Sequence, residues 1–202
     1  MALRRWAPLA AMAFALSAAG PVERVQSLPP EAQAAALDVH YHRQTKESSC
    51  GAAALHSVME YWGDKTVQQA SIIKDHPPAN EREGYSLGEM KRIAQSLGFK
   101  AFVVAGAEGF LSRQLGLGRP VIVPVTLEFG KQEAQALGLT AEEYEKIREK
   151  HGLRYNHFLV IIGRSKDFFV ALDPAKGIYL VDKNSLETMR APHKDAALLI
   201  SL

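Results

Sequence analysis

Residues 44–62 read "QTKESSCGAAALHSVMEYW" and contain the only cysteine of the chain, Cys50. After it, apolar side chains recur at intervals of three and four residues, at Leu55, Val58, Met59 and Trp62. This spacing predicts a core helix over residues 50–62, with Ser48 or Ser49 as its cap. The cysteine therefore falls in the first turn of a buried helix.

Helices are predicted mainly in the first half of the chain and strands mainly in the second. Capping boxes at Thr66–Gln69 and Ser86–Glu89 indicate two further helices. Apolar, β-rich runs follow, with short helices expected over residues 108–115 and 140–152 between them. These runs are "KAFVV", "PVIVPVTL", "HFLVIIGRS", "DFFVALD", "GIYLVDK" and "AALLISL". The segregation predicts an α+β fold, in which an N-terminal helical layer packs on a C-terminal antiparallel sheet.

The first residues have the layout of a secretory signal peptide. Arg4 and Arg5 precede an uncharged, mostly apolar run, "WAPLAAMAFALSAA" over residues 6–19, which ends in a small-x-small cleavage pattern. This run is too short for a comfortable membrane span. We predict a signal peptide over residues 1–19 and export, most simply to the periplasm. The alternative is a buried or interfacial N-terminal helix.

The remaining chain is long enough for one domain with a proper core. Residues 20–37 are rich in Pro, Ala and Glu and are interpreted as a linker or pro-segment, and residues 38–202 as the domain. No later stretch could cross a bilayer, so no stable membrane span is expected after signal cleavage. The chain has 24 Lys and Arg against 22 Asp and Glu, and the two basic residues of the signal account for the difference. This balance gives no reason to expect a nucleic-acid partner.

A single cysteine in an exported chain must be buried, paired with another chain or reactive. Cys50 lies where free backbone N–H groups and the helix dipole favour a thiolate, the form that attacks carbonyls. Gly51 and the alanines after it remove bulk beside the sulfur. The alternative is a small buried hydrophobic residue, which does not explain the polar residues before Cys50.

Few histidines of the chain suit the role of base to this cysteine. His56 is six residues away along the helix and points elsewhere. His40 and His42 lie in "DVHYHRQ", a predicted short strand; they could form half a metal site, but no further Cys/His cluster supports it. We therefore expect no metal and no cofactor. His157 differs, because it opens an apolar strand, where an imidazole is costly without partners.

Asp173 and Gln44 complete the candidate site. Asp173 ends the strand after that of His157, so a hairpin of the two strands places both at the same edge of the sheet. The carboxylate can then fix the imidazole tautomer and support the imidazolium. Gln44 lies six residues before Cys50, near enough to donate its amide N–H to an oxyanion. Alone, Asp173 would be read as a turn residue and Gln44 as a surface residue.

The pattern Q-x5-C-G-A-A, followed by H-F-x-V and D-P-x-x-G, resembles the bacteriocin-processing, double-glycine-type cysteine peptidases. The resemblance covers residues 38–183 and includes "GYSLGEMKRIAQSLGF". It implies a papain-like fold and a thiol hydrolase without cofactor. It also implies a role for each of four residues. Cys50 is the nucleophile, His157 the general base and acid, Asp173 the orienting group and Gln44 the oxyanion donor. Usual substrates of the family are leader peptides that end in two small residues, commonly Gly-Gly.

The chain departs from the common family pattern in three ways. Ser49 stands where many members have Asp, a signal peptide replaces the exporter domains, and residues 128–155 are longer than a simple strand connection needs. The chain thus resembles exported, stand-alone members, including the peptidase of functional-amyloid secretion systems. We expect a peptide or protein substrate, with a secretion-system component as partner. Two alternatives remain: a catalytically silent substrate-binding module, and a cysteine amidase acting on cell-wall peptides.

Overall fold

A six-stranded antiparallel sheet forms the centre of the computed structural model, which describes residues 28–106, 109–128, 130–136, 138–151 and 154–202. The strand order is β1-β6-β2-β3-β4-β5. The strands are β1 Lys100–Ala105, β2 Val121–Glu128, β3 Arg154–Arg164, β4 Phe168–Asp173, β5 Gly177–Asp182 and β6 Ala196–Ser201. The predicted signal peptide, residues 1–19, lies outside the described residues.

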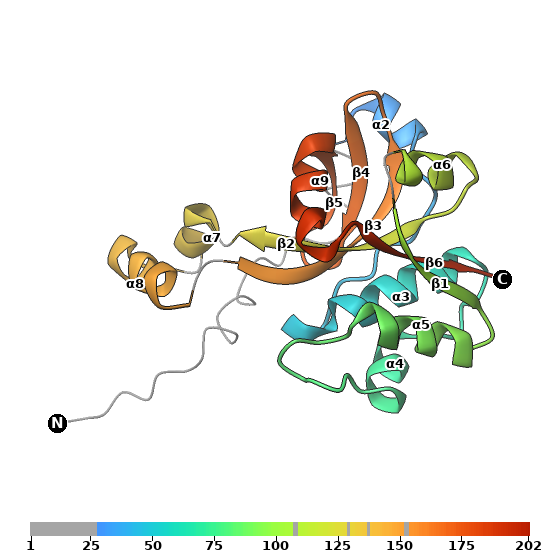
Figure 1. Cartoon of the computed structure of the whole chain (residues 1–202), viewed down its shortest axis with the longest axis horizontal. Helices are drawn as coiled ribbons and strands as arrows, with labels where there is room; N and C mark the ends of the chain where they lie inside the picture. Colours follow the sequence, from blue (N-terminus) through green and yellow to red (C-terminus); the bar gives the residue numbers. More distant parts are fainter. Residues whose placement is uncertain (1–27, 107–108, 129, 137, 152–153) are drawn as a thin grey trace.

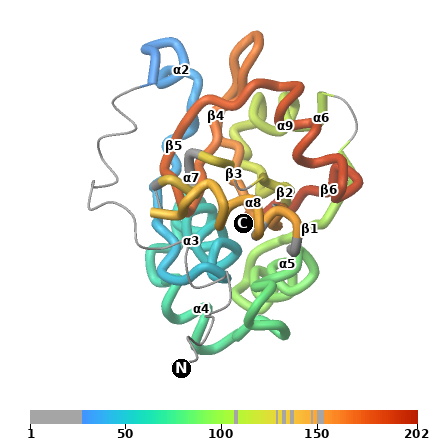
Figure 2. The backbone as a smooth tube through the Cα atoms, turned by 90° about the vertical axis from the view of Figure 1, so that its left-hand side faces the viewer, coloured from blue at the N-terminus to red at the C-terminus, as the bar shows by residue number. Residues whose placement is uncertain are grey.

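Helices cover both faces of this sheet (Figure 1). On one side, α3, α4 and α5 form the predicted N-terminal helical layer, and on the other lie α6 and α9. Figure 2 shows the same separation from the side, with α3, α4 and α5 grouped together. The bounds are α2 Pro30–Ala34, α3 Cys50–Tyr61, α4 Gln69–Asp75, α5 Leu87–Ser96, α6 Phe110–Gly116, α7 Lys131–Ala136, α8 Ala141–His151 and α9 Lys183–Arg190. The predicted α+β class is confirmed.

Two hydrophobic cores lie on the two faces of the sheet. Successive side chains of a strand point to opposite faces, and β3 follows this rule. Its Val160 and Ile162 belong to the core shared with α3 and α5, whereas Leu159 and Ile161 belong to the core shared with α6 and α9. This explains why the β3 sequence is a continuous apolar run: both of its faces are buried.

The central helix α3 is buried along almost its whole length, from Cys50 to Met59. Small residues at its start allow this close packing. A Cβ atom added at Gly51 would lie 2.9 Å from the Cβ of Tyr85, closer than side chains tolerate. The first turn of α3 is thus fixed by packing against the segment that leads into α5.

Three local predictions were wrong. No Ser48 or Ser49 side chain caps α3; a 3₁₀ turn, Glu47–Ser49, precedes the helix and uses the Ser49 hydroxyl internally. Residues 38–44 form no strand; instead, the Gln44 N–H donates to the Pro174 carbonyl, and His40 and His42 contact Glu60 of α3. The capping box of α4 is formed by Gln68 and Ser71 instead of Thr66 and Gln69. The predicted Ser86–Glu89 box of α5 is confirmed.

The described part of the predicted linker, residues 28–37, packs on the folded body. Leu28 and Ala32 are buried in the core that contains α3. Ala36 forms a β-bridge with Gly163, and the Leu37 N–H donates to the Ile162 carbonyl at 2.7 Å. The described residues of the predicted linker or pro-segment therefore pack on the domain that follows them.

Helices α7 and α8 belong to the predicted excursion over residues 128–155 and stand apart from the other helices at one end of the molecule (Figure 1). Thr140 caps α8 with Glu143, and the ion pair of Glu142 with Lys146 lies on its exposed side. Among the described helices, none combines the length and apolar character needed to cross a membrane.

Candidate active site

The structure brings Cys50, His157 and Asp173 together from three elements. Cys50 is the first residue of α3. His157 lies on β3, opposite Val125 of β2. Val160 of β3 pairs with Leu172, so Asp173, the last residue of β4, lies beside the β3 stretch that contains His157. The central helix and the sheet thus meet at the sulfur.

A hydrogen bond joins the two sheet residues, with 2.7 Å between His157 Nε2 and Asp173 Oδ1. Because Nε2 is engaged by the carboxylate, Nδ1 is the ring nitrogen left for the hydrogen bond between His157 and the Cys50 sulfur. The order Cys50–His157–Asp173 is that of a nucleophile, a base and the group that orients the base.

Burial makes the charges of this group strongly interdependent. His157 is 6% exposed and Asp173 is fully buried. Burial alone would lower the pKa of His157, but the hydrogen bonds and charges of Asp173 and Cys50 outweigh it and raise this pKa to about 10. Burial raises the pKa of Asp173, yet the bond to His157 and its charge hold that pKa below its ordinary value. The imidazolium–carboxylate pair is therefore the stable form at neutral pH.

Asp173 is held by three further donors. The backbone N–H groups of Ala175 and Lys176 donate to Oδ1 at 2.8 and 3.3 Å, and the Tyr179 hydroxyl donates to Oδ2 at 3.2 Å. Burial and the charge of Asp173 raise the pKa of Tyr179, which keeps it a neutral donor. The carboxylate is thus fixed in orientation without losing its charge.

Gln44 is buried beside the turn that precedes Cys50. Its Nε2 donates to the carbonyls of Lys46 at 3.0 Å and Glu47 at 3.1 Å, and its Oε1 is buried without a partner among the described residues. An amide nitrogen carries two hydrogens, so both are used. To donate to an oxyanion, the Gln44 amide would have to give up its hydrogen bond to the carbonyl of Lys46 or to that of Glu47.

The segment around Gln44 is fastened to the end of β4. The N–H of Gln44 donates to the Pro174 carbonyl at 2.9 Å, and the Tyr41 hydroxyl donates to the same oxygen at 3.2 Å. Pro174 directly follows Asp173. The predicted oxyanion donor and the predicted orienting group are thereby linked through one carbonyl.

Sequence reasoning missed Gln69, which holds the loop before Cys50. Its Oε1 accepts from the N–H and hydroxyl of Thr45 at 2.9 and 2.8 Å, and from the Ser49 hydroxyl at 3.4 Å. Its Nε2 donates to the Arg43 carbonyl at 2.9 Å. Ser49 thus contributes to the same loop. No local signal distinguishes Gln69, because its partners lie about 20 residues earlier in the chain.

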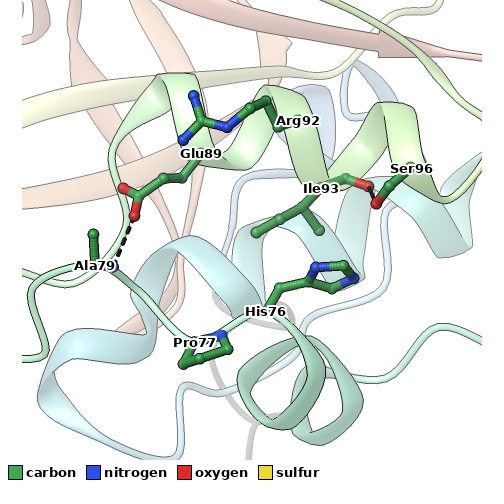
Figure 3. Close-up of a pocket in the computed structure, with 7 residues that line it drawn as sticks. All are labelled: His76, Pro77, Ala79, Glu89, Arg92, Ile93 and Ser96. Carbon is green, nitrogen blue, oxygen red and sulfur yellow. Dashed lines mark hydrogen bonds between the residues drawn. The ribbon is translucent and has the colours of Figure 1, made fainter.

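A surface pocket lies elsewhere, between the end of α4 and α5 (Figure 3). There the Glu89 carboxylate accepts from the Ala79 N–H at 2.8 Å. The pocket is lined by His76, Pro77, Ala79, Glu89, Arg92, Ile93 and Ser96. None of these is a predicted site residue, so the pocket and the Cys50 group are separate.

Comparison with known proteins agrees with this geometry. Residues 38–130 match the Peptidase C39 family. The matched part includes Gln44 and Cys50, whereas His157 and Asp173 lie beyond it and are placed by the fold alone. The comparison with curated proteins gave no match.

Solved structures extend the likeness to about four fifths of the chain. The peptidase domain of Streptococcus ComA, a bi-functional ABC transporter involved in quorum sensing, is 19% identical with a TM-score of 0.57, over 80% of this chain and 98% of that one. A double glycine motif protease from an AMS/PCAT transporter, in complex with the leader peptide, is 17% identical with a TM-score of 0.56, over 82% and 93%. A protein described as a C39-like peptidase from Bacillus anthracis is 15% identical with a TM-score of 0.62, over 83% and 97%.

The chain has the fold of a papain-like cysteine peptidase. The family match covers the helix that begins with Cys50, and the structural likeness covers 80–82% of the chain. The match of residues 38–130 to the Peptidase C39 family and the likeness to double-glycine peptidase domains confirm the resemblance expected from the sequence.

Proposed function

We propose that this protein is an exported endopeptidase that cleaves a peptide or leader after a pair of small residues, in support of a secretion system. The observation that carries the catalytic part is the buried chain of contacts from Cys50 through His157 to Asp173. The substrate class rests on the family match and on the leader peptide bound by the double glycine motif protease.

In the proposed reaction the Cys50 thiolate attacks the carbonyl carbon of the scissile bond, and the carbonyl oxygen becomes an oxyanion. The backbone N–H of Cys50 and the side chain of Gln44 stabilise that oxyanion. The imidazolium of His157 then donates its Nδ1 proton to the leaving amine, which leaves an acyl group on Cys50. Water then attacks the thioester while His157 takes its proton, and cleavage of the carbon–sulfur bond releases the acid product and restores the thiolate–imidazolium pair.

A binding module with an unused cysteine is the main alternative. It is less favoured, because Asp173 is buried, charged and held by donors in a way that a binding surface does not need. A cysteine amidase acting on cell-wall peptides would use the same three residues, because such geometry does not name the substrate.

A peptide assay separates these possibilities. The substrate is a synthetic leader with Gly-Gly before the scissile bond, and the control carries Leu-Leu there; products are identified by mass spectrometry. We expect cleavage after Gly-Gly only. Binding without cleavage would favour the silent module, and cleavage of cell-wall peptides alone would favour the amidase.

Gln44→Ala is expected to lower kcat/KM roughly 10²–10³-fold, the typical effect of losing one oxyanion donor. Iodoacetamide alkylation of Cys50 forms no oxyanion, so its rate should stay within about twofold of native. Both rates are measured on the same preparation. A parallel fall of both would contradict the oxyanion role and make Gln44 a residue that only holds the loop.

Export is proposed on the basic and apolar pattern of residues 1–19. Expression of the full chain in a Gram-negative host, followed by N-terminal sequencing of the periplasmic fraction, tests it. We expect a mature chain that begins at Gly20. An uncleaved chain confined to the cytoplasm would contradict export.

A further inference from the structure

A second cluster of titratable side chains lies beside α3, away from Cys50. His40 and His42, from the segment before α3, both contact the carboxylate of Glu60 in the last turn of α3. Nδ1 of His40 lies 3.3 Å from Glu60 Oε1, and Nε2 of His42 contacts Oε2. The proposed mechanism uses none of these three residues.

The three ligand-type atoms have the spacing of a metal site. One atom from each of His40, His42 and Glu60 can be chosen so that all lie within 4.8 Å of one another. Bonds of about 2.0–2.1 Å to a tetrahedral ion place ligand atoms roughly 3.3 Å apart. The separation of His40 Nδ1 from Glu60 Oε1, 3.3 Å, already has this value, and one ligand atom of His42 lies within 4.8 Å of the ligand atoms of both.

His56 supports the cluster from the buried side. Its ring stacks on that of His42 with 3.4 Å between centroids, and its Nε2 lies 4.0 Å from Glu60 Oε2. The Gln69 N–H donates to His56 Nδ1 at 3.4 Å, so the proton of the neutral ring is on Nε2, facing Glu60. The His56 ring thus packs against one proposed ligand and faces the carboxylate of another.

We propose that His40, His42 and Glu60 bind a divalent transition-metal ion of the Zn²⁺ class, with a water molecule at the fourth position. Two imidazoles and one carboxylate form a donor set that suits Zn²⁺ rather than Mg²⁺ or Ca²⁺, which prefer oxygen ligands. His40 is largely exposed, with 67% of its side chain accessible, so the ion can enter from solvent.

Such an ion would fasten the segment before Gln44 to the last turn of α3. His42 is two residues from Gln44, and Glu60 is ten residues from Cys50, about 15 Å along the helix. The ion would therefore not touch the sulfur. Its role would be to hold the segment that carries Gln44 against the helix that carries Cys50.

The test uses the full chain with Cys50→Ala, because a thiolate beside His157 could itself bind Zn²⁺. Zn²⁺ is titrated against a chromophoric chelator, and Co²⁺ binding is followed by its visible absorption. We expect one equivalent bound. Adding Glu60→Gln or His42→Gln should weaken binding at least about tenfold, and adding His76→Gln, outside the cluster, should change it less than twofold.

His40→Gln serves as a second ligand variant at an exposed position, should Glu60→Gln fail to fold. The site is supported if His40→Gln weakens Zn²⁺ binding while His76→Gln leaves the Zn²⁺ affinity of the Cys50→Ala protein unchanged. Absence of bound metal in the Cys50→Ala protein, or equal affinity in the ligand variants and His76→Gln, overturns it and leaves a hydrogen-bonded His–Glu cluster. Either result is independent of the peptidase activity.

Discussion

Cys50→Ala is expected to abolish hydrolysis of the Gly-Gly peptide, with a loss in kcat on the order of 10⁴-fold or more. The physical reason is that the Cys50 sulfur is the atom that carries the acyl group in the proposed reaction. Rates are measured by mass spectrometry of the products under single-turnover conditions. The fold should survive, because alanine fits the buried position at a cost of no more than ~2 kcal/mol.

Cys50→Ser is the matched variant, since it keeps the volume and removes only the sulfur. It should be as inactive as Cys50→Ala, because the hydroxyl is far less nucleophilic than the thiolate. Circular dichroism and thermal melting show whether both variants fold. Substantial cleavage by folded Cys50→Ala would mean that another group performs the reaction.

Asp173→Asn is expected to lower kcat/KM roughly 10²–10⁴-fold at pH 7. Asparagine can still accept the His157 Nε2–H bond, but it removes the charge that supports the imidazolium. Asp167→Asn is the matched control, because Asp167 is exposed at the opposite end of the same hairpin. Equal activity of the two variants would show that the Asp173 charge has no part in the reaction.

The same variant has a defined pH signature. Burial lowers the pKa of His157, whereas Asp173 and Cys50 raise it to about 10. Without the carboxylate the pKa should fall, so the alkaline limb of the pH–rate profile should move to lower pH. In the native chain, the stability contributed by protonated His157 is complete below about pH 6.5 and is lost as the pH rises through about 10. An unchanged alkaline limb in Asp173→Asn would contradict this assignment.

Much of the fold could be predicted because its patterns are local. The stripe after Cys50, the Ser86–Glu89 box and the alternation of apolar strands each depend on neighbouring residues. Helix α9 was missed, because "KNSLETMR" has few apolar residues and its N-cap, Asp182, is also the last residue of β5. The cap of α3 was predicted wrongly, because the Ser49 hydroxyl forms hydrogen bonds with the backbone of Lys46 in the preceding 3₁₀ turn and does not cap α3.

The site was predictable only as far as topology constrains it. A hairpin fixes which ends of two strands meet, so His157 and Asp173 could be paired from the sequence. Tyr179, Gln69 and Glu60 could not be found, because their partners are set by packing between elements and not by spacing within one. The expectation of no metal site rested on His40 and His42 alone, and the fold adds the Glu60 carboxylate.

The most direct measurement of the central claim is the pH dependence of Cys50 alkylation by iodoacetamide, in native protein and in His157→Ala. Because the chain has one cysteine, the total alkylation rate reports on Cys50 alone. If His157 and Cys50 form an ion pair, native protein should react at least about tenfold faster than His157→Ala between pH 5 and 7. Superimposable pH profiles for the two proteins would contradict the pairing and, with it, the proposed nucleophile.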